Sequence, residues 1–585
     1  MAGPIARALL YARTLRHLRP RQLLYLPLRR LQRGAPGAAG APATAADAPR
    51  LSPRADSLRD TMIAWGPRNE DAVARADAVL AGRFTFLNHT ETLPRIDWRR
   101  RHVSHLWSYN LHYFDYAADL AWAWRLTADA RYAERFVELA TGWAAATAGL
   151  RGDGWEPYTV SLRVVNWASA LLLLEDAVPA DVRARLLASA HAQLVALERQ
   201  VEWHLLANHL QKNLQALAVG GLLFDDAAAR RWRARYPALL WREVTEQVLP
   251  DGGHFERSPM YHLVALVDLL ETVALARAAG ERVPAAVVAR LEAMVRATAV
   301  LVRPDGALHL FNDAANGIAP PRAYADRLAG MTLDAGIPDA RGQLALPDTG
   351  YFGVAEGGDR LLVDCGAAAP DYQMGHAHCD LLSFELDLAG APVVVDSGVS
   401  GYDGDPLREY ARSTRAHNTV VIAGREQHEV WGTFRVARRA RVVAARARSD
   451  GGVFLFEGAY RPYHAPRAEH RRTVEREGRE VRVTDVVAGA GGARLESHLH
   501  LHPDVAVALE GHVAVLRWPG GGARVDWFGV DAVALHRGET APAQGWYCPE
   551  FGIALTAPCL TATVRSNDGR PFGFRIVPGA PTATG

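Results

Sequence analysis

The periodicity of apolar residues changes once along this chain, and that change restricts the fold to two kinds of domain in series. From about residue 57 to residue 340, apolar residues recur at i, i+3, i+4 and i+7, the spacing of amphipathic helices. After Pro347 the pattern has period two, as in Leu382–Leu388. Because one core rarely serves a chain of 585 residues, the sequence predicts an all-α domain followed by an all-β domain.

Short Gly, Pro or Asp breaks separate the helical segments, which suggests about ten helices joined by short loops. The clearest periodic segments are Leu111–Thr147, Val160–Leu174, Ala180–Trp203, Leu210–Phe224, Arg231–Leu249, Tyr261–Ala279 and Pro284–Val302. Short loops favour antiparallel hairpins. Hairpins packed in series predict an α/α toroid, an incomplete barrel of helical hairpins whose loops line a central groove.

Short alternating segments with Gly-rich turns follow at roughly ten-residue spacing, which is typical of an antiparallel β-sandwich. They are Pro392–Asp396, Asn418–Ala423, Arg441–Arg448, Val453–Tyr460, His470–Glu477, Val481–Val487, Arg494–His502, Val513–Trp518 and Ala523–Phe528. We therefore divide the chain into a basic N-terminal arm with a low-complexity linker (1–54), a toroid domain (55–345) and a β-sandwich domain (346–585).

The N-terminal arm has ten arginines and one acidic residue, Asp47. Arginines interrupt every apolar stretch that might serve as a secretory signal, so no clear export signal is present. The leucines indicate a basic amphipathic helix interrupted at Pro20 and Pro27. Such an arm is a candidate for peripheral contact with an anionic membrane surface, and a solvated arm is an equal alternative.

Composition excludes other classes of protein. The net charge of +2 gives no field that would recruit nucleic acid. No apolar run approaches the roughly 18 to 20 residues of a membrane span. The four cysteines, Cys365, Cys379, Cys548 and Cys559, have no CxxC spacing, so buried free thiols are expected rather than disulfides.

A cluster of titratable residues lies inside the predicted strands of the β domain. His376 and His378 are two residues apart, Asp396 ends a run of valines, and His417 follows in Arg415-Ala416-His417-Asn418. Imidazole and carboxylate ligands suit a zinc ion and leave one imidazole for chemistry. A hydrogen-bonded His/Asp cluster without a metal is the alternative.

Polar residues also gather at two predicted helix starts of the helical domain. Asn208 and His209 open one helix, where N–H groups and the helix dipole favour an anion. For Asn208 an ordinary N-cap is the alternative. Tyr261 follows Ser258-Pro259 at the second helix start. We expect these loops, with a third at Phe311-Asn312-Asp313, to converge on the groove.

At this point the chain resembles the heparinase II/III family of polysaccharide lyases. The residues that carry the resemblance are Asn208-His209 with Asn213, Gly253-His254-Phe255-Glu256 with Tyr261, Trp155-Glu156-Pro157-Tyr158 with Arg163 and Trp167, and the segment from His376 to His417. The family has an α/α toroid followed by an antiparallel β-sheet domain, in agreement with the periodicity.

The resemblance implies an enzyme, a carbon-oxygen lyase, that cleaves an acidic, uronic-acid-containing polysaccharide by β-elimination. It implies catalytic roles for Asn208 and His209, which would neutralise the substrate carboxylate and stabilise the enolate. Tyr261 would be general acid, with a second role as base left open, and His376 the partner base.

The resemblance also implies that His378, Asp396 and His417 hold a structural Zn²⁺, with no organic cofactor. Since residues i and i+2 on a strand face the same side, a turn or bulge must separate the roles of His376 and His378. The candidates for substrate binding are Tyr109, Trp155, Arg163, Glu256, Arg412 and Arg415. For the arginines a structural ion pair is the alternative, and for the aromatics core packing.

Three other functions remain open at this stage. A uronate C5-epimerase would use the same Tyr/His set without cleavage. A glycoside hydrolase would need two carboxyl groups about 5 to 9.5 Å apart, with Glu256 and Asp313 as candidates. A non-catalytic exopolysaccharide-assembly protein is the third. Family resemblance suggests the cell envelope or periplasm, and the lack of a clear signal leaves the cytoplasm open.

Overall fold

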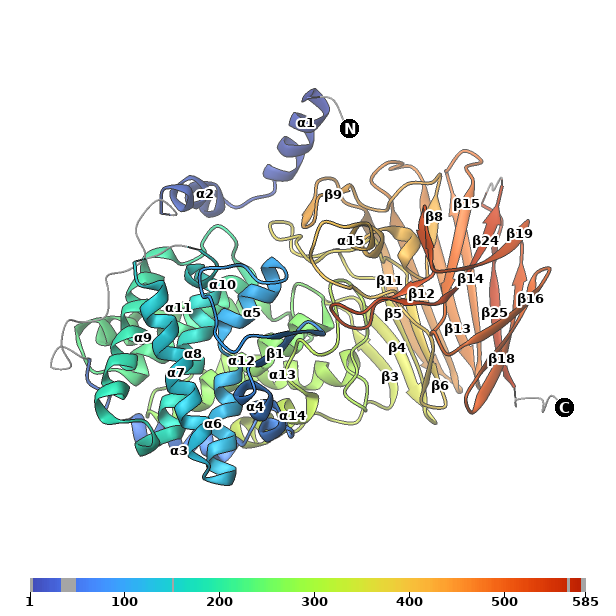
Figure 1. Cartoon of the computed structure of the whole chain (residues 1–585). Coiled ribbons are helices and arrows are strands. Elements are labelled where there is room, and N and C mark those ends of the chain that lie inside the picture. Colours follow the sequence, from blue (N-terminus) through green and yellow to red (C-terminus); the bar gives the residue numbers. More distant parts are fainter. Residues whose placement is uncertain (1–3, 33–48, 150–151, 566–568, 580–585) are drawn as a thin grey trace.

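The computed structural model describes residues 4–32, 49–149, 152–565 and 569–579. A helical domain and a β domain lie side by side, and the N-terminal arm lies above the helical domain in Figure 1. This arrangement confirms the predicted order of an α/α toroid followed by an antiparallel β domain.

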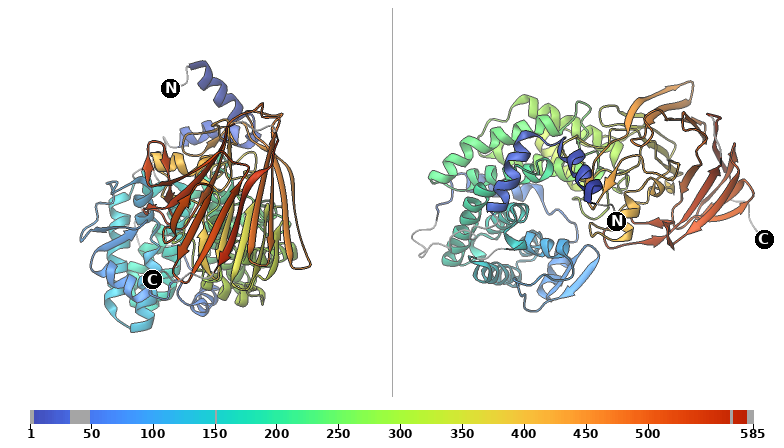
Figure 2. Two further views of the ribbon diagram at one scale, coloured as in Figure 1. Left: turned by 90° about the vertical axis from the view of Figure 1, so that its right-hand side faces the viewer. Right: turned by 90° about the horizontal axis from the view of Figure 1, so that it is seen from above.

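The helices form an open ring when seen from above (Figure 2, right). They are α3 (Ala55–Trp65), α4 (Ala72–Leu80), α5 (His105–Tyr113), α6 (Tyr116–Thr127), α7 (Ala130–Thr147), α8 (Pro157–Leu174), α9 (Ala180–Gln200), α10 (Ala207–Leu223), α11 (Ala227–Gln247), α12 (Pro259–Ala278), α13 (Ala285–Leu301) and α14 (Arg322–Leu333). Apolar faces of neighbouring helices share one large core, so the ring is held by burial of their inner sides.

The segment predicted as one periodic run, Leu111–Thr147, is three helices. The chain turns at Phe114 and Ala128, which adopt positive φ values of 60° and 58°. The Asp129 carboxylate then caps α7 by accepting a hydrogen bond from the Arg131 backbone N–H at 3.0 Å. Periodicity alone did not separate these helices because apolar residues continue across both turns.

The central helix of the toroid is α12, which packs against α10, α13 and α14. Among the described residues it is the one helix long and apolar enough to cross a membrane by length and composition. Most of it is buried inside the protein, as expected of a core helix. The sequence contains no uninterrupted apolar run of this length, because Asp268 and Glu271 lie among the apolar residues of α12.

The β domain consists of stacked antiparallel sheets (Figure 2, left). The five-stranded sheet next to the toroid contains β3 (Gly342–Leu346), β4 (Tyr351–Glu356), β5 (Asp359–Asp364), β6 (Phe384–Leu388) and β7 (Ala391–Val394) in that order. A second sheet has the order β11-β12-β13-β14-β25-β18-β17-β16 and a third β19-β24-β15-β8. Side chains from all three sheets share one apolar core.

The strands of the second and third sheets are β8 (Val420–Ile422), β11 (Arg441–Asp450), β12 (Val453–Arg461), β13 (Glu469–Glu477), β14 (Glu480–Ala488), β15 (Leu495–His500), β16 (Ala506–Glu510), β17 (Val513–Trp518), β18 (Gly521–Phe528), β19 (Ala532–Arg537), β24 (Pro558–Val564) and β25 (Phe572–Gly579). All four cysteines are free and buried, which confirms the expectation of buried thiols.

Polar contacts of the loop before α12 help to fix the toroid against the β domain. The Asp251 carboxylate, in the loop before α12, accepts hydrogen bonds from the Thr349 backbone N–H and hydroxyl, both at 2.7 Å. Gly253 lies so close that an added Cβ would be 1.8 Å from Thr349 Oγ1. This loop therefore reaches the interface only with glycine at that position, and it leads directly into α12.

The N-terminal arm forms α1 (Pro4–Leu15) and α2 (Pro20–Gln32). Pro20 begins α2 rather than only interrupting a helix, and Pro27 lies inside it. In α1, Thr14 accepts a hydrogen bond from Trp431 Nε1 at 3.0 Å. In α2, the Gln22 side chain donates to the Tyr372 carbonyl of the β domain at 3.1 Å and to the His204 carbonyl of the toroid at 3.4 Å. The arm therefore lies across the junction between the two domains.

Candidate active site

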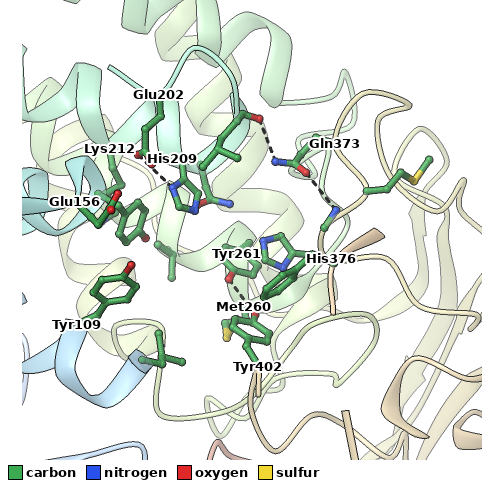
Figure 3. A pocket seen from close by; sticks show the side chains of 18 of the residues that line it. Tyr109, Glu156, Glu202, His209, Lys212, Met260, Tyr261, Gln373, His376 and Tyr402 are labelled. Carbon is green, nitrogen blue, oxygen red and sulfur yellow. Dashed lines mark hydrogen bonds and ion pairs between the residues drawn. The ribbon is translucent and has the colours of Figure 1, made fainter. Parts of the chain in front are cut away.

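A cavity of about 810 Å³ lies where the toroid meets the β domain (Figure 3). Its walls come from α5, α8, α10 and α12, from the loop containing residues 371–376, and from the N-terminal arm. Of the residues predicted from the sequence to be catalytic or to bind substrate, it is lined by Asn208, His209, Tyr261, His376 and Tyr109. The four predicted catalytic residues thus come together from three separate segments.

The Asn208 side chain is fixed by a carboxylate from the neighbouring loop. Its amide donates to both oxygens of Glu256 at 3.0 Å. Glu256 is 1% exposed, so this contact lies out of solvent. The N-cap of α10 is Leu206, which makes no side-chain cap bond. The alternative of an N-cap role for Asn208 is therefore wrong, and its amide carbonyl remains for the cleft.

His209 presents one ring nitrogen to the cleft. Its Nδ1 lies 3.2 Å from the Glu202 carboxylate, and its ring lies 4.6 Å from the Tyr158 ring. Burial lowers the pKa of His209, but the Glu202 carboxylate outweighs this effect and the pKa is raised overall. The imidazolium form that this favours suits an anionic ligand.

Tyr261 stands in the first turn of α12. The Ser258 hydroxyl caps the helix by accepting from the Tyr261 N–H at 3.2 Å, and Pro259 takes the first helical position. The Tyr261 hydroxyl lies 3.0 Å from the Tyr402 hydroxyl. Burial and the adjacent Tyr402 raise the pKa of Tyr261 well above its usual value, so the phenol stays protonated.

His376 comes from the β domain and meets Tyr261 in the cleft. The two ring centroids are 4.0 Å apart (Figure 3). His376 Nδ1 lies 2.8 Å from Asp313 Oδ2, which leaves Nε2 as the nitrogen for chemistry. His376 and His378 lie in a loop, not on a strand. Both rings contact Asp313, since His378 Nε2 is 2.8 Å from Oδ1.

Asp313 is fully buried and ion-paired with the Arg408 guanidinium. Burial alone would raise its pKa, but Arg408 and the two imidazoles hold the pKa of Asp313 well below its usual value. The carboxylate therefore stays ionised and orients the His376 ring.

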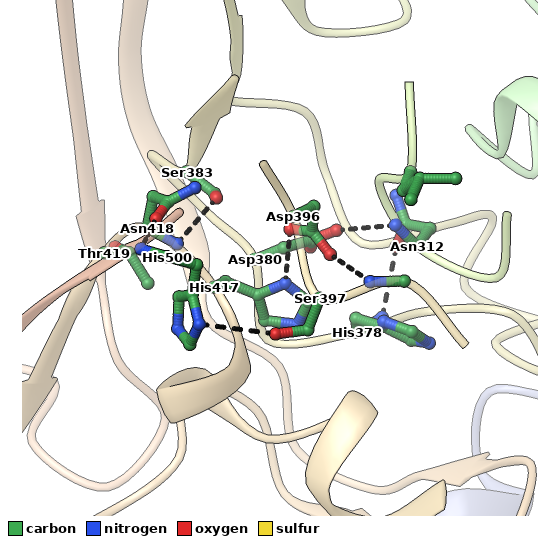
Figure 4. Close-up of polar contacts among 12 residues, drawn as sticks. Asn312, His378, Asp380, Ser383, Asp396, Ser397, His417, Asn418, Thr419 and His500 are labelled. Carbon is green, nitrogen blue, oxygen red and sulfur yellow. Dashed lines mark hydrogen bonds and ion pairs between the residues drawn. The ribbon is translucent and has the colours of Figure 1, made fainter. Parts of the chain in front are cut away.

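The predicted metal ligands lie together behind this pair (Figure 4). His417 Nδ1 lies 2.7 Å from Asp396 Oδ2, and the His378 and His417 ring centroids are 5.4 Å apart. The second nitrogen of each ring is buried with no hydrogen-bond partner. As arranged here, no three His, Cys, Asp or Glu side chains among the described residues surround a point that would hold a metal ion.

The predicted substrate-binding residues divide into two groups. Tyr109 lines the cleft, and Glu256 lies beside it. Arg163 does not reach the cleft, because its buried guanidinium stacks 3.7 Å above the Trp143 ring and donates to Gln193 at 2.8 Å.

Three other candidates are also absent from the cleft lining. Trp155 donates its indole N–H to the Thr147 carbonyl at 3.0 Å. Arg412 donates to three backbone carbonyls, among them that of Ala377 at 3.3 Å. The backbone carbonyl of Arg415 accepts from His500 Nε2 at 2.9 Å, and its side chain is only partly exposed. The structure therefore places these three residues outside the lining of the cleft.

The sequence did not assign four residues that shape the site: Asp313 as the partner of His376, Arg408, Tyr402 and Glu202. Asp313 was visible as part of a polar loop and was considered only for hydrolysis. The other three carry no local motif, and chain folding alone brings them to the cleft.

The fold and the site together define a class of two-domain proteins. In this class an open α/α toroid is closed on one side by an antiparallel β domain, and a tyrosine and a histidine meet at the junction. Two family models cover most of the chain, "Heparinase II/III N-terminus" over residues 66–324 and "Heparinase II/III-like, C-terminal" over residues 338–574. The chain belongs to the heparinase II/III family.

The chain is similar to two kinds of relative, which are named as a heparin-sulfate lyase and as an FtsZ-localized protein. A heparin-sulfate lyase of Pedobacter heparinus is 28% identical over 364 residues, which are 53% of this chain and 55% of the relative. The FtsZ-localized protein C of Caulobacter vibrioides is 25% identical over 497 residues, or 80% of this chain and 81% of the relative. The chain thus spans little more than half the length of the lyase it matches.

Among solved structures, heparinase III aligns over 95% of this chain and 89% of its own with a TM-score of 0.68 at 17% identity. At that identity the likeness establishes the fold.

Proposed function

We propose that this protein cleaves a uronic-acid-containing polysaccharide by β-elimination. The observation that carries the proposal is the meeting of Tyr261 and His376 in one cleft, with ring centroids 4.0 Å apart, one from each domain. Elimination needs a base for the proton beside the carboxylate and an acid for the departing oxygen. The imidazole held by Asp313 and the protonated phenol supply these two groups.

The steps follow from the position of each group. The His209 imidazolium neutralises the substrate carboxylate and stabilises the enolate that forms, while Asn208, whose amide N–H is held by Glu256, lines the cleft beside it. His376 Nε2 accepts the C5 proton. Tyr261 then donates its proton to the departing 4-oxygen, which leaves an unsaturated sugar and a new chain end. The raised pKa of Tyr261 supports the acid role over the base role.

The purified protein, incubated with a panel of uronate polymers, should release products that absorb ultraviolet light through their new double bond. Tyr261→Phe should lower the rate by at least about 10²-fold. Release of reducing ends without this absorbance would contradict elimination, and inversion at C5 without cleavage would identify an epimerase. Hydrolysis is disfavoured because neither of its two candidate carboxylates, Glu256 and Asp313, lines the cleft.

A second candidate is a non-catalytic role in polysaccharide or cell-envelope assembly. The relative named FtsZ-localized protein C matches 80% of this chain, more than the 53% matched by the lyase. If this role is correct, Tyr261→Phe and His376→Ala should leave the biological activity of the protein intact in cells lacking the wild-type chain.

We also propose that His378, Asp396 and His417 hold a structural zinc ion. Two imidazoles and a carboxylate are zinc donors, and His378 Nδ1 and His417 Nε2 are buried without partners. A bound ion would supply positive charge and fix the loop that carries His376. Elemental analysis should find about one zinc per chain, and chelation should lower the melting temperature; a metal-free protein with the same melting temperature would exclude the site.

Finally, we propose that the N-terminal arm contacts an anionic membrane surface of the cell envelope. Ile5, Leu9, Leu24 and Leu28 are exposed on α1 and α2 among exposed arginines such as Arg16. Apolar side chains next to positive charge suit the interface of an anionic bilayer. The protein should sediment with phosphatidylglycerol vesicles, and Leu24→Glu should weaken this binding; equal binding to neutral phosphatidylcholine vesicles would contradict the proposal.

A further inference from the structure

The N-terminal arm forms part of the wall of the cleft. Seen from above, the two blue helices α1 and α2 overlie the open ring beside the β domain (Figure 2, right). The family model of the toroid begins at residue 66, so the arm lies outside the two family domains. The side chains of α1, of α2 and of the turn between them that line the cleft are Tyr11, Thr14, Leu15, Leu18, Gln22 and Leu26.

The arm rests on the two domains without adding an apolar side chain to their cores. Of the described residues 4–28, Gln22 alone is buried, and its side chain contacts both domains. The Arg21 guanidinium lies 3.4 Å above the Trp203 ring of the toroid. Other contacts are ion pairs of partly exposed arginines, which contribute little to stability. The arm is therefore held on the cleft by a small free energy.

The outer face of the arm carries exposed apolar side chains. Ile5 is 79% exposed and Leu24 is 61% exposed. At about 100° per residue, Ile5 and Leu9 lie on the side of α1 opposite Thr14, which is hydrogen-bonded to Trp431. Figure 1 shows that the N-terminal end of α1 points away from both domains. Exposed apolar side chains gathered in this way mark an interaction surface.

The cations that hold the arm on the cleft are also those that an anionic bilayer would bind. Arg13 pairs with Glu429, and Arg19 pairs with Glu246. Lipid phosphates compete for the same guanidinium groups. Leu15 lines the cleft and is still 42% exposed, so it lies at the rim. A bilayer thus interacts more favourably with the released arm than with the docked arm, and such a difference shifts the equilibrium towards release.

We infer that α1 and α2 are a movable cover of the cleft, and that an anionic phospholipid bilayer removes this cover by binding its arginines and leucines. With the cover in place, the arm narrows the cleft on one side. With the arm on the bilayer, the cleft is open to a polymer near the membrane surface. The inference rests on the proposed membrane contact and adds that this contact controls access to the cleft.

A fluorescent label tests whether the arm moves. The four native cysteines are free and buried, so one cysteine introduced at the surface can be labelled selectively. A bimane on Tyr11→Cys should be quenched by Trp431, because the Tyr11 and Trp431 rings are 4.9 Å apart. Phosphatidylglycerol vesicles should raise its emission at least about twofold as the population shifts from docked to released. Phosphatidylcholine vesicles should leave the emission unchanged.

The matched control carries the same label in a Trp431→Phe background. It should be bright without vesicles and should not respond to either lipid. Quenching that persists when the labelled protein sediments with phosphatidylglycerol vesicles would overturn the inference and leave the membrane proposal intact. Failure to sediment with these vesicles would sink both.

The rate of polymer cleavage tests whether the arm limits access. Phosphatidylglycerol vesicles should raise kcat/KM at least about threefold, and Gln22→Ala should raise it without vesicles, because this variant removes the contacts of the arm to both domains. Gln343→Ala removes a comparable contact, to the Ala447 carbonyl at 3.3 Å, outside the cleft and should change nothing. Inhibition by the vesicles, or release of the label without a rise in the rate, would overturn the inference.

Failure of the lyase proposal is distinguishable from failure of this inference. If no uronate polymer is cleaved, the lyase proposal fails, and calorimetric binding of a uronate hexasaccharide replaces the rate. Its dissociation constant should then be at least about threefold lower in Gln22→Ala than in the wild type, because a larger fraction of the protein has an open cleft. Equal binding to the two proteins, or no binding to either, would overturn the inference.

Discussion

At the scale of single residues, the proposed catalytic groups are oriented by carboxylates from other elements. Asp313 holds His376 in one tautomer, and Glu202 holds His209. In both cases the carboxylate contacts Nδ1 and leaves Nε2 for the cleft. Two buried carboxylates thus determine which nitrogen of each imidazole reacts or binds.

The Glu202–His209 pair predicts the pH dependence of substrate binding. Since the pKa of His209 is raised, its positive charge is present at low pH and is lost as the pH rises through that raised pKa. KM should therefore be low at acid pH and rise on the alkaline side. Glu202→Gln should move this rise to lower pH by about one unit.

Steady-state kinetics across pH would check this shift. Glu198→Gln is a matched control, because Glu198 pairs with Arg231 outside the cleft. An unchanged pH profile of KM in Glu202→Gln would show that His209 does not bind the substrate carboxylate.

The sequence indicated the residues of the cleft where a polar motif interrupts an apolar pattern, as at Asn208, Tyr261 and His376. It did not separate cleft residues from core residues of the same type. Arg163 and Trp155 stand in the same motif as Tyr158, yet of these three residues Tyr158 alone lines the cleft. Which way a side chain on a loop or helix points depends on packing between helices far apart in the chain, which one sequence does not reveal.

At the scale of elements, the start of α12 sets the position of Tyr261. The Ser258 hydroxyl accepts from the Tyr261 N–H and donates to the Asp313 carbonyl at 2.6 Å. Ser258→Ala should lower the free energy of unfolding by about 1 kcal/mol. It should also lower kcat by about tenfold or more, because the phenol and the Asp313 loop lose their common anchor.

Removal of a second helix cap separates these two effects. Asp226 caps α11 through the Ala229 N–H at 2.7 Å and does not line the cleft. Asp226→Ala should cost a similar stability, measured by urea unfolding, with kcat unchanged. Equal kcat in the two variants would mean that the Ser258 cap has no part in placing Tyr261.

In the β domain, a buried ion pair joins β13 to β14 directly across the ladder. Arg472 and Asp485 are register partners, and two guanidinium nitrogens contact the carboxylate at 2.7 and 2.8 Å. Burial would raise the pKa of Asp485, but Arg472 and His470 lower it to about 2. The resulting stability is present above the unfolded pKa of about 3.9 and is lost as the pH falls towards 2.

Asp485→Asn should therefore cost about 3–5 kcal/mol at neutral pH, because it leaves Arg472 buried without its counter-charge. The cost should shrink as the pH falls from 5 to 2, which urea unfolding at several pH values would measure. Asp526→Asn, in a more exposed pair with Arg524 on β18, should change stability by less than about 0.5 kcal/mol. A cost for Asp485→Asn that does not vary with pH would contradict the assignment.

The predicted elements were most accurate where one face is buried and the pattern is long, as in α13 or β12. The missed elements are either short or show little difference between buried and exposed positions. The helices α3, α4 and α14 have nine to twelve residues, while β4 and β5 are buried at nearly every position and show little alternation. An amphipathic pattern requires a solvent-facing side, and a strand between two layers does not have one.

At the scale of the whole molecule, each domain supplies half of the cleft, so the interface between them is part of the site. Arg303, just after α13, donates to Glu385 and Asp387 of β6 at 2.8 and 2.9 Å. All three side chains are buried. The same Glu385 carboxylate contacts His309 at 2.5 Å. This network ties the end of the toroid to β6, the strand that follows the His376 loop.

Arg303→Leu removes the cation and leaves two buried carboxylates without it, which should cost about 3–5 kcal/mol. Because the lost contacts lie between the domains, we expect calorimetry to resolve one unfolding transition into two. The kcat of the variant should fall below that of Arg185→Leu, in which an exposed pair on α9 is broken and stability changes by less than about 0.5 kcal/mol. A single transition with unchanged kcat would show that the domains hold Tyr261 and His376 together without this network, through their other polar contacts and apolar packing.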